Sequence, residues 1–158
     1  MRLYLTQHGL AVPPEVDRDR PLSLAGREDV RRLAAFLQGA GVRVHQVLHS
    51  GKTRAEQTAA LLAEVVLPAG RPQVRPGLGP NDPVEPLSGT LAAWSEDALL
   101  VGHLPFLGRL ASLLLLSDPA RPMLAFQPGT AVCLERDSEG RWSLGWMLPL
   151  EHLVPARG

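Results

Sequence analysis

Short apolar segments typical of β-strands alternate with amphipathic segments typical of helices along most of this chain. The predicted strands of this pattern are residues 2–6, 44–49, 73–75 and 98–101, and the predicted helices are residues 23–38, 53–67, 87–96 and 105–116. The strand at 98–101 is apolar without polar alternation, as expected for a parallel strand that is covered on both faces. Repeated β-α-β units place helices on both sides of a sheet, so we expect a three-layer α/β/α sandwich with a mostly parallel sheet.

The C-terminal part of the chain departs from this alternation. Residues 131–136 and 141–148 are two predicted strands, and the turn Asp137–Gly140 between them indicates an antiparallel hairpin. Trp142 and Trp146 have even spacing, so we expect both side chains on the same side of their strand. A length of 158 residues suits one compact domain, and we expect a single domain over residues 1–158.

Two predicted helices carry start signals. Ser23 is a suitable N-cap for the helix over 23–38. Thr53 and Glu56 have the spacing of a capping box, in which Thr53 caps the helix and Glu56 reaches back to it. This interpretation makes Arg54 the first residue of its helix.

The composition excludes several classes of protein. Lys and Arg together number 16, as do Asp and Glu, and a neutral chain is not typical of nucleic-acid binding. The most apolar stretch, residues 98–116, is interrupted by polar and helix-breaking residues, so no membrane span is expected. Cys133 is the single cysteine and cannot form an internal disulfide. We expect a cytoplasmic protein without a metal ion or cofactor.

Polar side chains follow three of the predicted strands directly. His8 follows the first, His49 and Ser50 end the second, and His103 follows the strand at 98–101. Ligands of such sheets bind beyond the carboxyl ends of the strands, so these side chains are expected at one rim. Arg54 lies at the start of a helix, where free backbone N–H groups and a guanidinium together favour an anion.

Two histidines and an arginine around an anion site suit phosphoryl chemistry. A neutral imidazole can attack phosphorus directly. Nearby cations lower the pKa of that imidazole, keep it neutral and bind the phosphate as well. A zinc site is not favoured, because the chain has no HExxH motif.

Four segments of the chain resemble motifs of the histidine phosphatase superfamily, in the order in which that family has them. They are Gln7-His8-Gly9, the segment Ser50-x3-Arg54-Ala-Glu-Gln-Thr-Ala, Gly102-His103-Leu-Pro, and Asp17-x2-Arg20-Pro-Leu-Ser-x2-Gly26. The last of these is similar to the lead-in of the small SixA-like branch, the phosphohistidine phosphatases. The resemblance covers essentially the whole chain.

This resemblance implies a role for each matched residue. His8 would be the nucleophile that forms a phosphohistidine intermediate, and Arg54 and His103 would hold the phosphoryl oxygens. The chain has no room for the inserted cap of the larger relatives, and an open site suits a phosphorylated protein, such as a histidine-phosphotransfer domain. A small phosphate ester is the alternative substrate.

Gln7 stands where the family has a phosphate-binding arginine. Loss of one strong oxyanion donor typically costs roughly 10²–10³ in rate. Arg20 and Lys52 are the candidate compensating cations, and Ser50 and Asp82 are further accessory candidates. Gln7 keeps a second hypothesis open, in which the protein binds phosphate but has impaired turnover.

Overall fold

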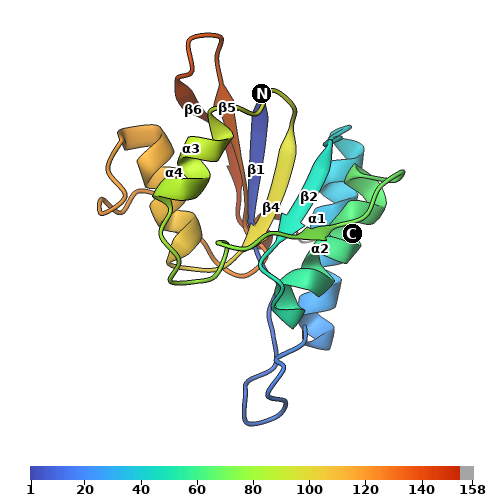
Figure 1. Cartoon of the computed structure of the whole chain (residues 1–158). Coiled ribbons are helices and arrows are strands. Elements are labelled where there is room, and N and C mark those ends of the chain that lie inside the picture. The colour runs from blue at the N-terminus through green and yellow to red at the C-terminus, as the bar shows by residue number, and fades with distance from the viewer. Residues whose placement is uncertain (154–158) are drawn as a thin grey trace.

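The computed structural model describes residues 1–153, and the last five residues of the predicted domain, 154–158, lie outside the described part. The strands form a six-stranded sheet in the order β3-β2-β4-β1-β5-β6 (Figure 1). Their bounds are Arg2–Gln7 for β1, Gln46–His49 for β2, Gln73–Val74 for β3, Ala98–Gly102 for β4, Ala131–Arg136 for β5 and Trp142–Leu148 for β6. The pairs among β3, β2, β4 and β1 are parallel, whereas β5 pairs antiparallel with both β1 and β6. The predicted sheet and its antiparallel hairpin are therefore confirmed.

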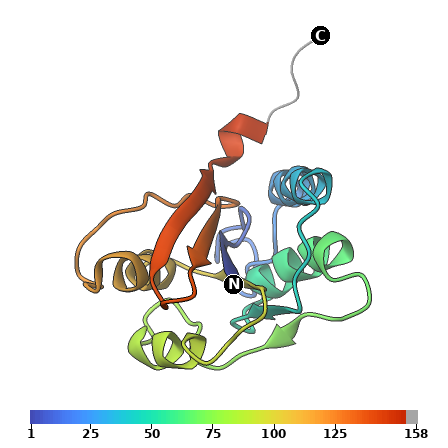
Figure 2. The same ribbon diagram turned by 90° about the horizontal axis from the view of Figure 1, so that it is seen from above.

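The helices cover both faces of the sheet. Their bounds are Leu24–Gly39 for α1, Thr53–Val66 for α2, Glu85–Leu91 for α3 and Phe106–Leu116 for α4, and a short 3₁₀ helix, η1, covers Leu150–Leu153. Seen from above, α1 and α2 lie on one side of the strands, and α3 and α4 lie on the other (Figure 2). This arrangement is the predicted α/β/α sandwich.

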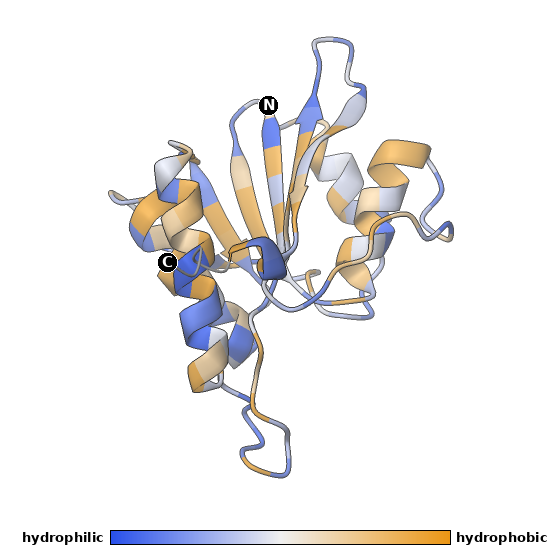
Figure 3. Ribbon diagram, turned by 180° about the vertical axis from the view of Figure 1, so that it is seen from behind, coloured by the Kyte–Doolittle hydropathy of each residue, from blue (hydrophilic) through white to orange (hydrophobic). Residues whose placement is uncertain are grey.

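Two hydrophobic clusters fill the spaces between the layers. Strand β1 contributes to both, because Tyr4 faces the cluster under α1 and α2, and Leu3 and Leu5 face the cluster under α3 and α4. All five residues of β4 are buried. Hydrophobic residues accordingly dominate the inner strands in the hydropathy view (Figure 3). The central strands are thereby packed on both faces, and their carboxyl ends lie at one edge of the buried core.

The helix starts were predicted with mixed success. Ser23 caps α1, because its hydroxyl accepts a hydrogen bond from the Gly26 N–H at 3.0 Å. The capping box at Thr53 and Glu56 is wrong, because Lys52 is the N-cap of α2 and its side chain makes no capping bond. The Lys52 carbonyl instead accepts the N–H groups of Ala55 and Glu56. The N-cap therefore lies one residue earlier than predicted, and Arg54 is the second residue of the helix.

Helix α3 also differs from its prediction of residues 87–96. It begins at Glu85, with Pro86 in the first turn, and ends at Leu91. The Arg136 guanidinium donates to the carbonyls of Leu91 and Trp94. The Leu91 carbonyl also accepts the Trp94 N–H at 3.1 Å. A side chain of β5, which is distant in sequence, thus donates hydrogen bonds to backbone carbonyls at the end of this helix.

The expectation that Trp142 and Trp146 face the same side is wrong. Trp146 packs in the cluster under α1 and α2, whereas Trp142 packs in the cluster on the other face. The register shifts within this pair of strands, because Cys133 pairs with Trp146 and Leu134 pairs with Leu144. The extra residue, Gly145, is a β-bulge that reverses the alternation between the two tryptophans.

Within residues 1–153, no helix has the length and apolar character that crossing a membrane requires.

Candidate active site

His8, Ser50 and His103 meet at one edge of the sheet. They follow β1, β2 and β4, and β4 lies between the other two strands. The His8 N–H donates to the Gly102 carbonyl at 3.0 Å, which joins the chain after β1 to the end of β4. The two imidazole rings then lie with their centroids 5.0 Å apart. The predicted convergence of these side chains at the carboxyl ends of the strands is what the structure contains.

The His8 ring is oriented by contacts at both nitrogens. Its Nδ1 lies 2.7 Å from the Gly9 carbonyl, which can only accept, so Nδ1 carries the proton of the neutral ring. Nε2 therefore has the lone pair, and it accepts a hydrogen bond from Arg54 Nε at 3.3 Å. Burial lowers the pKa of His8, as do the nearby guanidinium groups of Arg54 and Arg20. A neutral imidazole with Nε2 free to attack is the form that nucleophilic chemistry needs.

His103 is buried and is held by Ser50. Its Nε2 lies 2.6 Å from the Ser50 hydroxyl, across 53 residues of sequence. The Lys52 N–H donates to the same hydroxyl at 3.3 Å. His103 Nδ1 is buried and has no hydrogen-bond partner among residues 1–153. Burial, followed by the charges of neighbouring groups that include His8, Arg54 and Lys52, lowers the pKa of His103 to about 3.

Sequence reasoning missed Thr58, which joins the His8 segment to α2. Its hydroxyl accepts the Gly9 N–H at 3.0 Å and donates to the Arg54 carbonyl at 2.8 Å. Gln57 makes a similar link, because its Oε1 accepts the Leu22 N–H at 2.8 Å. Both residues lie in the matched segment after Ser50, and their place in that motif was the available signal. These contacts fix the position of Arg54 relative to His8.

A glycine allows α1 to approach the chain that follows His8. A Cβ at Gly26 would lie only 2.0 Å from the Leu10 carbonyl oxygen, so no other residue fits without moving the backbone. The Ser23 N–H donates to that same carbonyl at 2.9 Å. The matched segment ending at Gly26 thus packs the first helix directly against the site loop.

The two candidate compensating cations lie near this cluster. Arg20 has a positive φ of 48°, and its Nε donates to the Val12 carbonyl at 3.2 Å, which orients the guanidinium. The Arg20 charge contributes to the lowered pKa of His8, Arg54 and His103 alike. Lys52 is exposed at the start of α2. Gln7 is buried, and its Oε1 has no hydrogen-bond partner within the described residues.

Asp82 and His49 have other contacts. The Asp82 carboxylate accepts the Gly79 N–H at 2.7 Å and lines a small cavity with Arg75 and Thr90. His49 is buried, and its Nδ1 accepts the Gly51 N–H at 3.2 Å. The structure therefore does not bring Asp82 into the cluster, and it gives His49 a structural contact at the end of β2.

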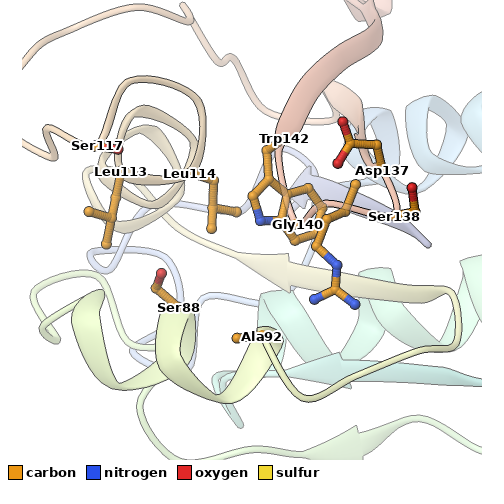
Figure 4. A pocket seen from close by; sticks show the side chains of 10 residues that line it. Ser88, Ala92, Leu113, Leu114, Ser117, Asp137, Ser138, Gly140 and Trp142 are labelled. Atoms are coloured by element: carbon orange, nitrogen blue, oxygen red, sulfur yellow. The ribbon is translucent and has the colours of Figure 1, made fainter.

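A cavity of about 610 Å³ lies at the other end of the sheet, beside the β5–β6 turn (Figure 4). Its lining includes Trp142, Ser88 and Asp137. The Arg136 guanidinium in its wall is already bonded to the carbonyls that close α3. We assign this cavity to the packing of α3 and α4 against the hairpin.

The buried neutral His103 predicts a pH-dependent stability. Below pH 6.5 the unfolded chain protonates this histidine, whereas the folded chain does so only near pH 3. Between these values the unfolded state binds one more proton, so the unfolding free energy should fall by about 1.4 kcal/mol for each pH unit of acidification. Denaturant unfolding of wild type and His103→Gln from pH 6.5 to 4 checks this. The variant should lack that part of the slope, and parallel curves would contradict the expectation.

Comparison with known proteins agrees with this geometry. Residues 3–79 match the histidine phosphatase superfamily (branch 1). An uncharacterized protein of Picosynechococcus sp. is 37% identical over 118 residues, which cover 70% of this chain and 71% of that protein. The phosphohistidine phosphatase SixA of Escherichia coli is 28% identical over 153 residues, which cover 94% of this chain and 93% of SixA.

A solved structure extends the similarity to three dimensions. The protein histidine phosphatase SixA complexed with tungstate has a TM-score of 0.85 and 27% identity, and the match covers 98% of this chain and all of that one. The family match at residues 3–79 includes the segments that carry His8 and Arg54. The two SixA matches span nearly the whole chain, on which His103 also lies. The chain therefore belongs to the histidine phosphatase superfamily, in its SixA-like branch.

Proposed function

We propose that this protein is a phosphatase in which His8 attacks the phosphorus of phosphohistidine on a phosphorylated protein, with no metal ion needed in the reaction. The observation that carries the proposal is the hydrogen bond from His8 Nδ1 to the Gly9 carbonyl at 2.7 Å, because it leaves the lone pair on Nε2. Arg54, which contacts Nε2 in the free site, would turn its donors to the phosphoryl oxygens.

The reaction balances in two displacement steps. In the first, a P–N bond to His8 Nε2 forms as the P–N bond of the substrate breaks, and the substrate imidazole leaves. If that imidazole carries a proton on its distal nitrogen, it leaves as a neutral ring and needs no general acid. In the second step water attacks phosphorus and the P–N bond to His8 Nε2 breaks. Inorganic phosphate leaves with the water oxygen, one water proton passes to the solvent, and His8 returns to its neutral form.

The charges around His8 support binding of a dianion. Arg54 and Arg20 lie close enough to lower the pKa of both histidines, and Lys52 adds to the effect at His103. We propose Arg54, His103 and Gln7 as the phosphate-binding groups, with Gln7 contributing its amide. Ser50 would hold His103 in place through its 2.6 Å contact.

The comparisons support phosphatase activity and the choice of substrate class. SixA of Escherichia coli, a phosphohistidine phosphatase by name, aligns over nearly the full length of both chains. The SixA structure holds tungstate, which is a tetrahedral oxyanion like phosphate. A histidine-phosphotransfer domain is the kind of phosphoprotein that we propose as partner.

Hydrolysis by the purified protein tests the proposal directly. In the presence of EDTA we expect release of phosphate from a peptide that carries phosphohistidine and from para-nitrophenyl phosphate, and we expect vanadate to inhibit both reactions. Vanadate adopts the five-coordinate geometry of phosphoryl transfer and should be bound better than the substrate. A folded protein that releases no phosphate from either compound would exclude the activity.

Gln7 favours the second candidate, a module that binds phosphate without turnover, and two variants separate the candidates. If Arg20 replaces the charge missing at position 7, Gln7→Arg should raise kcat/KM for the aryl phosphate by less than about tenfold. It should also restore most of the activity lost in Arg20→Gln. A rise of roughly 10²–10³ in Gln7→Arg over an almost inactive wild type would instead support the binding module. The assay is steady-state hydrolysis by the two single variants and the double variant.

A further inference from the structure

A groove lies beside the proposed active site, along the first turns of α4. It has a volume of about 370 Å³, and its lining includes Leu104, Pro105, Gly108, Met123 and Leu124. Leu104 and Pro105 follow His103 directly in the chain. A group in this groove would therefore lie next to the residue that we propose to hold the phosphoryl oxygens.

The groove exposes apolar side chains that the described part of the chain, residues 1–153, does not cover. Leu104 is 39% exposed and Met123 is 47% exposed, although the neighbouring residues Phe106 and Leu107 are fully buried. Single exposed apolar residues are common on protein surfaces. Two of them that line one cavity beside a reactive site make a surface suited to an apolar ligand group.

Gly108 keeps the floor of the groove open. It lies inside α4, where glycine destabilises a helix relative to alanine. A Cβ at this position would meet only Leu104 Cδ2, at 4.0 Å, which is an ordinary contact. Packing among the described residues therefore does not explain the glycine. A larger side chain here would occupy the space that a ligand group could use.

Two arginines give the groove its charge. Arg109 on α4 and Arg121 on the following loop both line it, and neither forms a salt bridge within residues 1–153. Among residues 1–153, no carboxylate lines the groove. The nearby Asp118 uses Oδ1 to accept the Ala120 N–H. An apolar floor with cationic edges complements a segment that carries an apolar residue among acidic ones.

We propose that this groove docks an acidic segment of the protein substrate, with one apolar side chain of that segment inserted over Gly108 and the phosphorylated residue directed to His8. The proposal rests on the proposed function and deepens it, because it assigns substrate preference to residues outside the phosphate site. A second copy of this chain is the competing occupant.

The test compares two synthetic peptides of equal length, each phosphorylated on its single histidine. One flanks the histidine with Leu and Glu, and the other flanks it with Ser and Lys. For every variant, kcat/KM for each peptide is divided by kcat/KM for para-nitrophenyl phosphate, so that effects on the chemistry cancel. Gly108→Phe fills the groove, and Arg109→Glu with Arg121→Glu reverses its charge. Gly89→Phe is the matched control, because Gly89 lies in α3 with open space around it.

We expect wild type and Gly89→Phe to prefer the Leu/Glu peptide by about tenfold or more, which is the change expected when one whole leucine side chain is buried. Gly108→Phe should abolish this preference, and the double charge reversal should invert it. A preference that is absent in wild type, or unchanged in folded Gly108→Phe, overturns the proposal. Dimerisation of wild type that Gly108→Phe abolishes, with the peptide preference unchanged, also overturns it in favour of a second copy.

A binding measurement keeps this result separate from the fate of the proposed function. In His8→Ala, the unphosphorylated Leu/Glu peptide should shift the methyl resonance of Met123 and leave those of Met1 and Met147 in place. This readout needs no turnover, so it stands even if wild type hydrolyses neither peptide. Absence of a Met123 shift at millimolar peptide overturns the docking site.

Discussion

Replacing His8 with alanine should abolish phosphate release, with a loss of at least about 10³-fold in kcat for an aryl phosphate. The physical reason is that the other histidine of the cluster has no lone pair available at the same point. His103 Nε2 is bonded to Ser50, and His103 Nδ1 is buried. The measurement is steady-state hydrolysis together with rapid acid-free quenching after incubation with a ³²P-labelled substrate. Wild type should carry an acid-labile, base-stable label, and the variant should carry none.

His45→Ala is the matched control for this experiment. His45 is exposed and lies 3.6 Å from Glu96, at the opposite end of β2 from Ser50. This variant should keep both the label and the turnover of wild type. Phosphate release by folded His8→Ala at the wild-type rate would contradict the assignment of the nucleophile.

Replacing Arg54 with alanine should lower kcat/KM by roughly 10²–10³, because it removes the charged donor nearest to the reacting nitrogen. The backbone of residue 54 keeps its role in α2, since Thr58 donates to the Arg54 carbonyl rather than to its side chain. We therefore expect thermal stability close to that of wild type, and the comparison of kinetics with the melting temperature checks both statements.

Two further variants sharpen this result. Arg54→Lys keeps the charge but loses the planar, bidentate guanidinium, so it should recover only part of the activity. Arg31→Ala, an exposed arginine that pairs with Glu28 on α1, should leave kcat/KM unchanged. Full activity in Arg54→Ala would mean that the phosphoryl group is held by other residues.

The local pattern of the chain was sufficient for most of the fold. The apolar run in β4 predicted a central buried strand, and all of its residues are buried. Ser23 predicted the start of α1 correctly, because an N-cap depends on atoms within one turn of the chain. His8 and His103 each follow a predicted parallel strand. Because the carboxyl ends of parallel strands lie at a common edge of the sheet, this position predicted that the two side chains would meet.

Other features depend on contacts between distant segments, and local patterns do not contain them. Ser50 contacts His103 across 53 residues of sequence. Sequence analysis gave Ser50 only as an accessory candidate, whereas the structure shows that it holds the His103 imidazole. Gly145 adds a bulge that is defined only by pairing with β5, and it places Trp142 and Trp146 on opposite faces.

The succession of strands and helices along the chain, the sandwich and the set of polar residues at its edge thus followed from periodicity and chain order, which are properties of the sequence alone. The tertiary structure decided which nitrogen of His8 keeps its lone pair, which hydroxyl holds His103 and where a groove stays open over Gly108. These outcomes depend on distances of a few ångströms between groups that come together only when the layers pack.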